Sequence, residues 1–185
     1  MAEHVCPWWI GYFLLNPFRK LTENPKKMFK DYLKPGMKVL EIGPGMGYFS
    51  LGMAEMVTPD GKVIAVDLQE KMLKALKRRA IKAGVAEQIE TRLCTEKSLA
   101  VDELTDKIDF VLAAYVVHEV PDQAGLLKEI YASLKPQGIL YLTEPKAHVN
   151  ETAYKATVEI ARQAGFSIIS GEPTASNRTT VFRKG

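Results

Sequence analysis

The sequence has few cysteines, a small charge imbalance and no targeting segment. Only Cys6 and Cys94 occur among 185 residues, and their wide separation excludes a disulfide framework and a four-cysteine zinc site. A reducing cytoplasm is therefore the expected location. Lys and Arg number 25 against 22 Asp and Glu, giving a net charge of +3. This small excess is spread along the chain and gives no reason to expect nucleic acid as a partner.

Long apolar runs are also missing. The run at residues 8–15 is much shorter than the ~20 residues that span a bilayer. Its flanks lack the basic start and small-residue cleavage site of a secretory signal. Apolar residues make up 46% of the chain and charged residues 25%, which excludes a disordered chain and a membrane bundle. The length predicts one domain.

Residues 1–32 are rich in aromatic side chains and differ in composition from the rest of the chain. We interpret them as a helical arm that precedes a domain at residues 33–185. Three roles are open: a helix that covers the domain, a lid that closes over the substrate, or docking on a membrane surface through basic residues after the aromatics. The lid is the role we carry forward as a hypothesis, and membrane contact is disfavoured. The aromatic residues that would form the lid are Trp8, Trp9, Tyr12 and Phe13.

After the arm, strand-like and helix-like segments alternate. Short β-branched or apolar runs predict strands at residues 37–42, 62–67, 88–93, 108–113, 139–143, 166–170 and 179–183. Amphipathic spacing with capping residues predicts helices at 48–57 and 69–83, from Asp122 to about 134, and from Asn150 or Thr152 to 164. Alternation of this kind predicts a doubly wound parallel α/β sheet. The last two strands have no helix between them and must be antiparallel.

The loop after the first strand carries the functional signal. In residues 39–47, VLEIGPGMG, a buried strand runs directly into three glycines spaced by two. Glycine permits positive φ and lets the backbone approach a ligand closely. Ligands of open α/β sheets bind beyond the carboxyl ends of the strands. The spacing is neither the G-x-G-x-x-G of dinucleotide sites nor a phosphate loop, because no Gly-Lys-Ser/Thr follows.

Asp67 ends the second strand, twenty residues after Gly47. An acid at this distance can accept hydrogen bonds from both hydroxyls of an adenosine ribose. Asp67 could instead cap the following helix. Together, the glycine spacing and the acid predict a nucleoside-containing cofactor.

These segments resemble the class I S-adenosylmethionine-dependent methyltransferases, in the small-molecule branch that includes the quinone C-methyltransferases. The resemblance covers residues 33 to the C-terminus and rests on residues 39–47, 63–68 (VIAVDL), 108–121 (IDFVLAAYVVHEVP) and 134–140 (LKPQGIL). It implies a Rossmann-like, doubly wound, seven-stranded sheet that is mostly parallel with an antiparallel C-terminal strand. It also implies S-adenosyl-L-methionine as the cofactor and in-line transfer of its methyl group.

The resemblance further implies a cofactor site. The glycine loop would contact the methionine part, Glu41 would order its amino group, Asp67 would hold the ribose, and Leu68 would contact the adenine. The family's usual Gly-Asp-Ala after strand three is replaced by Cys94-Thr95-Glu96, so the acid for the adenine amino group is out of register, and Thr95 or Glu96 is expected to replace it. The cofactor-binding residues predicted are Glu41, Gly43, Pro44, Gly45, Gly47, Asp67, Leu68, Thr95, Glu96 and Ala114.

Tyr115 and His118 are the candidate catalytic residues, because both follow the fourth strand at the ligand edge. His118 could act as a general base or be bonded only to nearby backbone. Tyr115 could shape the methyl channel or serve packing alone. Glu144 ends strand five on the same edge, and the adjacent Pro145 suggests a turn role equally well.

No metal site is predicted, since His4, Cys6 and Cys94 are too few soft ligands for one. The predicted partner is a small-molecule acceptor, and a homodimer is left open. The competing functions are an NAD-dependent oxidoreductase and a cofactor-binding subunit without catalysis.

Overall fold

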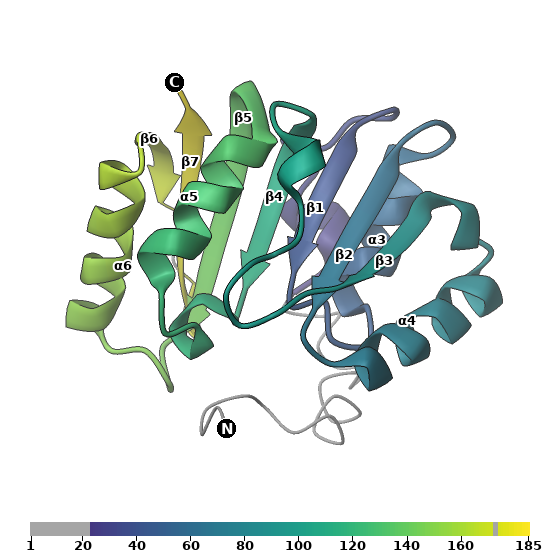
Figure 1. Cartoon of the computed structure of the whole chain (residues 1–185), viewed down its shortest axis with the longest axis horizontal. Coiled ribbons are helices and arrows are strands. Elements are labelled where there is room, and N and C mark those ends of the chain that lie inside the picture. The colour runs from purple at the N-terminus through teal and green to yellow at the C-terminus, as the bar shows by residue number, and fades with distance from the viewer. Residues whose placement is uncertain (1–22, 172–173) are drawn as a thin grey trace. The chain divides into compact units, whose positions relative to one another are not determined.

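The fold is that of a computed structural model, which describes residues 23–171 and 174–185. Seven strands follow the order β3-β2-β1-β4-β5-β7-β6 (Figure 1). Strand β7 is antiparallel to both of its neighbours. The predicted seven-stranded Rossmann-like sheet with an antiparallel terminal strand is confirmed. The chain forms two compact units that divide between Cys94 and Thr95, and each is described in turn.

The first unit contains three parallel strands and their connecting helices. Its elements are α2 (Pro25–Met28), β1 (Lys38–Ile42), α3 (Tyr48–Val57), β2 (Lys62–Asp67), α4 (Glu70–Ala83) and β3 (Ile89–Leu93). Strands β1 and β2 are buried along their length apart from their first residues, whereas no residue of β3 is fully buried. This difference matches the continuous apolar runs of β1 and β2 and the weaker pattern of the edge strand β3.

The described end of the N-terminal arm is fixed on α3. Asn24 caps α2 by accepting a hydrogen bond from the Lys26 amide. The Phe29 ring is fully buried, and its centroid lies 5.9 Å from that of Phe49. Lys26 also forms an ion pair of 2.7 Å with Glu55. The predicted lid aromatics lie in residues 1–22, outside the described residues.

The second unit contains the other four strands. Its elements are β4 (Ile108–Ala114), α5 (Gln123–Ser133), β5 (Leu134–Pro145), α6 (Glu151–Gln163), β6 (Phe166–Gly171) and β7 (Asn177–Lys184), with short 3-10 helices at Asp102–Leu104 and Val117–Glu119. The predicted caps act as expected, because Asp122 accepts from the Gly125 amide and Asn150 from the Ala153 amide. Helices α5 and α6 lie side by side, joined by a 2.8 Å hydrogen bond from Thr157 to Gln123.

One strand differs from its prediction. The sequence predicts a strand at 139–143, because Pro136 and Gly138 in the preceding run KPQG are typical of a turn, whereas β5 already begins at Leu134. The pairing with β4 shifts register between Ile108 and Phe110, and Gln137 has a φ of 66°. The turn residues are therefore accommodated as an irregularity within one longer strand. In the part of the chain that the structure describes, no helix is long and apolar enough to cross a membrane.

Candidate active site

In the glycine loop after β1, every second residue has a left-handed backbone. The φ angles of Gly43, Gly45 and Gly47 are 64°, 55° and 84°, where residues with a Cβ are strained. A Cβ built on Gly45 would meet no atom within 4 Å. The left-handed backbone at Gly45 therefore faces open space, as a loop that admits a ligand requires.

Gly47 has a different role in the same loop. A Cβ built there would stand 2.1 Å from Cδ1 of Leu76 on α4. Met46 is buried in a cluster with Met72 and Ala75 of α4. The Arg79 guanidinium donates to the Met46 carbonyl, and burial lowers the pKa of Arg79. Because Gly47 has no Cβ, α4 can pack directly against the loop.

The Asp67 carboxylate lies against the glycine loop. Its Oδ2 accepts a hydrogen bond of 3.3 Å from the Gly45 amide, and its Oδ1 accepts one of 2.8 Å from the Gln69 amide. Gln69 is the N-cap residue of α4, so Asp67 also orders the start of that helix. Of the two roles that the sequence allows, the structure shows the contact at the helix start, and it places the same carboxylate against the glycine loop. Binding of the ribose by Asp67 stays a prediction. Leu68 beside it is 38% exposed.

Glu41 is a buried carboxylate at the end of β1, 2% exposed. Its Oε2 accepts a hydrogen bond of 2.5 Å from the Ser50 hydroxyl on α3. This bond fixes the carboxylate beside the glycine loop, because Glu41 precedes Gly43 by only two residues. Pro44 is buried within the loop.

Thr95 and Glu96, expected to replace the family's missing acid, lie in a small turn. The Thr95 amide donates to the Ser98 carbonyl at 3.1 Å, and the Thr95 hydroxyl accepts from the Lys97 amide at 3.3 Å. Glu96 is exposed. The turn is held to α5 because Glu129 accepts from both the Ser98 hydroxyl and the Leu99 amide.

Tyr115 follows β4 directly and has a φ of 61°. A bulky residue in the left-handed region is a strained exception, and such strain gathers at functional sites. The Tyr115 amide donates to the Thr143 carbonyl at 2.9 Å. Its hydroxyl accepts from the Asn177 side chain at 2.7 Å. The main chain of Tyr115 is thereby held by β5 and its ring hydroxyl by β7. Ala114 before it is buried.

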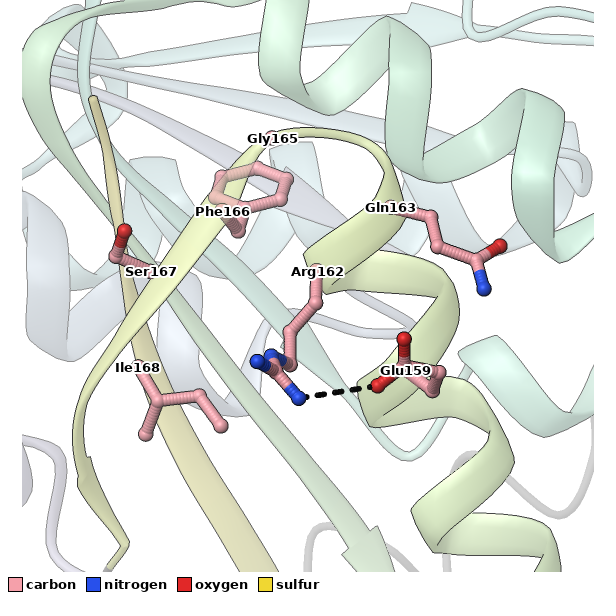
Figure 2. A pocket seen from close by; sticks show the side chains of 7 residues that line it. All are labelled: Glu159, Arg162, Gln163, Gly165, Phe166, Ser167 and Ile168. Carbon is pink, nitrogen blue, oxygen red and sulfur yellow. Dashed lines mark hydrogen bonds and ion pairs between the residues drawn. The ribbon is translucent and has the colours of Figure 1, made fainter.

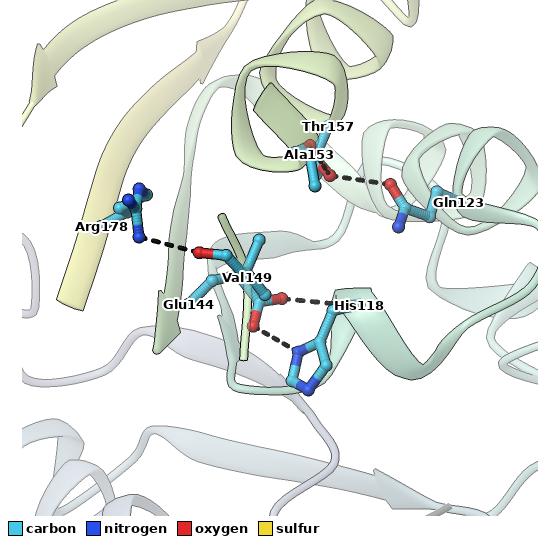
Figure 3. Close-up of polar contacts among 7 residues, drawn as sticks. All are labelled: His118, Gln123, Glu144, Val149, Ala153, Thr157 and Arg178. Carbon is cyan, nitrogen blue, oxygen red and sulfur yellow. Dashed lines mark hydrogen bonds and ion pairs between the residues drawn. The ribbon is translucent and has the colours of Figure 1, made fainter. Parts of the chain in front are cut away.

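His118 forms two hydrogen bonds with Glu144 at this edge. Glu144, only 1% exposed, accepts from the His118 amide at 3.1 Å and bonds the ring Nδ1 at 2.6 Å (Figure 3). The hydrogen bond that the His118 ring donates to Glu144 is the largest cause of a raised pKa for His118. Burial opposes this rise, and the charges of Glu144 and Glu119 add to it. The alternative of a histidine bonded only to backbone is thus replaced by a side-chain pair.

Sequence reasoning missed one residue of this edge and undervalued another. Asn177 was not considered, and the sequence holds no local signal for it beyond its place at the start of β7. Glu144 has a role at this edge and not only in a turn, but its pairing with His118 depends on how β4 and β5 align, which no local sequence pattern shows.

A pocket of about 630 Å³ lies elsewhere, where α6 ends and β6 begins (Figure 2). Its lining includes Arg162, which pairs with Glu159 at 3.2 Å. Strands β5 and β6 both run antiparallel to β7. The start of β6 therefore lies at the amino edge of these strands, opposite the carboxyl edge that holds His118 and Glu144. The pocket is separate from the candidate site.

The chain is similar to known proteins over most of its length. The family described as "Methyltransferase domain" matches residues 33–184. A demethylmenaquinone methyltransferase of Lactobacillus johnsonii is 31% identical over 126 residues, 68% of this chain and 51% of that protein. A ubiquinone biosynthesis O-methyltransferase of Xanthomonas axonopodis is 27% identical over 137 residues, 74% of this chain and 55% of that protein.

Among solved structures, a SAM dependent methyltransferase from Aquifex aeolicus has the same fold. Its TM-score is 0.87 at 23% identity, and the match covers 98% of this chain and 100% of that one. This chain spans about half the length of the curated relatives that it matches. The chain belongs to the methyltransferase domain family and has the class I S-adenosylmethionine-dependent methyltransferase fold.

The residues of the first unit fit this cofactor. Open space faces Gly45, and the carboxylates of Asp67 and Glu41 lie beside the same loop. The described residues contain no group of three or more His, Cys, Asp or Glu side chains that could hold a metal ion.

Proposed function

We propose that this protein transfers a methyl group from S-adenosylmethionine to a small-molecule acceptor. The observation that carries the proposal is the glycine loop, where a left-handed Gly45 faces open space and donates to the Asp67 carboxylate. The names of the two relatives above, both enzymes of quinone metabolism by those names, support an acceptor of small size.

The glycine loop, Glu41 and Asp67 each bind a different part of the cofactor. Gly43, Pro44 and Gly45 present main chain to the methionine part, and Gly47 keeps α4 close behind. Glu41 orders the amino group, and Asp67 accepts from the ribose hydroxyls. The exposed side chain of Leu68 offers an apolar surface to the adenine. The roles of Thr95, Glu96 and Ala114 toward the same cofactor stay predictions from the family resemblance.

The bound cofactor supplies both the methyl group and its leaving group. The protein's own contribution is to orient the acceptor and exclude water, and orientation of this kind can remove roughly 7–11 kcal/mol of a barrier. Tyr115 and His118 are the residues we assign to the acceptor side. Residues 1–32 form the proposed cover, for which the anchoring of Phe29 and Lys26 on α3 provides a fixed base.

The experiment combines labelling and calorimetry. Purified protein and methyl-labelled S-adenosylmethionine are incubated with the small-molecule fraction of a cell extract, and the labelled product is identified. We expect one labelled small molecule with the wild type and none with Gly45→Val. Titration with S-adenosylhomocysteine should show binding, while titration with NAD should show none. NAD binding without S-adenosylhomocysteine binding would overturn the proposal in favour of an oxidoreductase.

The proposed cover is tested separately. Deletion of residues 2–18 should abolish labelling while leaving the thermal unfolding transition and S-adenosylhomocysteine binding in place. Unchanged labelling by the deletion variant would remove the cover from the proposal without affecting the rest.

A further inference from the structure

Glu144 directs both of its carboxylate oxygens at a single residue. Oε1 accepts from the main-chain amide of His118, and Oε2 bonds the ring Nδ1. His118 is the middle residue of the 3-10 helix Val117–Glu119, and Figure 3 shows its ring with the second nitrogen directed away from Glu144. Two contacts between the same two residues fix both the turn and the ring orientation.

The pairing also decides which nitrogen carries the proton. An ionised carboxylate only accepts hydrogen bonds, so Nδ1 is the protonated nitrogen. In the neutral ring, Nε2 then has the lone pair, and this is the nitrogen that points away. The partner of one ring nitrogen sets the chemistry of the other. The pair therefore presents a proton acceptor whose direction is fixed.

The other groups around the pair are consistent with this role. The His148 ring on the β5–α6 loop lies edge-on to His118, with centroids 5.9 Å apart. Arg178 is the register partner of Glu144 on β7 and donates to the Val149 carbonyl at 2.8 Å. Burial raises the pKa of Tyr154 to about 12, so this side chain is neutral at the pH values of the tests below. Among the described residues, the charges of Glu144 and Glu119 act on His118, whereas Arg178 and Tyr154 bear on Glu144.

The position of the pair agrees with a place in the reaction. Strands β4 and β5 are parallel, and His118 and Glu144 lie at their carboxyl ends, where open α/β sheets bind ligands. The strained Tyr115 stands at the same edge.

We propose that Glu144 is a positioning residue that makes His118 the proton acceptor for a methyl acceptor whose attacking atom carries a proton. This inference rests on the proposed function. In the step, the proton of the acceptor's O–H or N–H bond moves to Nε2 of His118. The acceptor atom bonds the methyl carbon, and the electron pair of the methyl–sulfur bond stays on sulfur. Charge balances because the sulfonium becomes a neutral thioether while His118 becomes positive.

The first test needs no acceptor. Nitrogen-15 NMR of histidine-labelled protein should show the Nδ1–H tautomer for His118. Its pKa should lie above the ordinary value and fall in Glu144→Gln, but not in the matched Glu159→Gln, which removes an exposed carboxylate at the opposite edge. An Nε2–H tautomer, or a pKa that does not respond to Glu144→Gln, would overturn the inference.

The second test measures label transfer from methyl-labelled S-adenosylmethionine into the small-molecule fraction of a cell extract. The wild-type rate should rise with pH through the His118 pKa. Glu144→Gln should lower the plateau by about 100-fold, as expected for impaired base catalysis, and move the rising limb to lower pH. S-adenosylhomocysteine affinity should stay unchanged. A rate equal to that of Glu159→Gln would contradict the positioning role.

Two controls separate folding and function. If Glu144→Gln does not fold, His118→Gln must remove the rising limb, and its persistence would overturn the inference. If even the wild type transfers no label, the proposed function fails and this inference fails with it. If the Glu144→Gln and His118→Gln variants transfer label at the wild-type rate, this inference is rejected and the proposed function is unaffected.

Discussion

The loop after β1 and the edge after β4 and β5 are built by different means. Main-chain conformation makes the first, since left-handed glycines shape the loop and Asp67 binds an amide of it. Side chains make the second, through pairs such as His118 with Glu144 and Asn177 with Tyr115, which are 26 and 62 residues apart. Under the proposed function, the main-chain site would hold the cofactor and the side-chain site would face the acceptor.

The comparison predicts that Gly45→Val has the largest effect of any single change. A valine side chain would fill the space that faces Gly45, so S-adenosylhomocysteine binding should disappear in calorimetry. Left-handed backbone should also cost about 1–2 kcal/mol of unfolding free energy. Gly84→Val is the matched control, because Gly84 has a φ of 73° and equally open space at the end of α4. Equal binding by the two variants would place the ligand elsewhere.

Asp67→Ala should weaken binding without abolishing it. Hydrogen bonds to a charged group contribute about 1.5–3 kcal/mol, and the affinity for S-adenosylhomocysteine should fall by that amount. Asp102→Ala, which removes an exposed acid, should bind like the wild type. Wild-type affinity in Asp67→Ala would reduce this residue to its role at the start of α4.

Gly47→Ala tests whether Gly47 contributes to the packing of α4 against the loop, in contrast to the ligand-facing role of Gly45. Its Cβ would collide with the Leu76 side chain, and overpacking of this kind costs about 1–3 kcal/mol of unfolding free energy. Chemical denaturation of the single variants and of Gly47→Ala with Leu76→Ala should show non-additive losses. Strict additivity would mean that Gly47 does not act through α4.

The smallest predicted effect concerns pH and the second region. The pKa of His118 is raised in the folded state above an unfolded value near 6.5. Its contribution to stability is therefore complete below the unfolded value and is lost as pH rises through the folded one. The difference in unfolding free energy between wild type and His118→Gln should shrink from pH 5 to 9. A constant difference would show that the pair does not titrate as described.

Features that depend on neighbouring residues could be predicted from the sequence. The caps at Asp122 and Asn150, the stop of α4 at Gly84 and the glycine loop all follow from local backbone chemistry. The seven-stranded, mostly parallel sheet followed from the family resemblance, and the antiparallel end followed from the missing helix between β6 and β7.

Features that depend on register could not be predicted. Whether Glu144 reaches His118 is decided by how β4 and β5 align, and that alignment includes a shift near Ile108 that no sequence pattern marked. The bond from Asn177 to Tyr115 requires β7 to lie beside β5. The left-handed φ of Tyr115 could not be predicted either, because the residue is not a glycine or an asparagine, the types that usually adopt this conformation.

The interior place of β7 bears on biosynthesis. Strand β6 leaves the ribosome before β7, yet β7 is its partner in the sheet and separates it from β5. Until β7 is translated, the nascent chain carries β6 with exposed Ile168 and Ile169 and an unpaired backbone edge. Strands β4 and β5 can pair before β7 emerges, but β6 must wait for β7, so the β5–β7–β6 end of the sheet cannot form in the order in which it is translated.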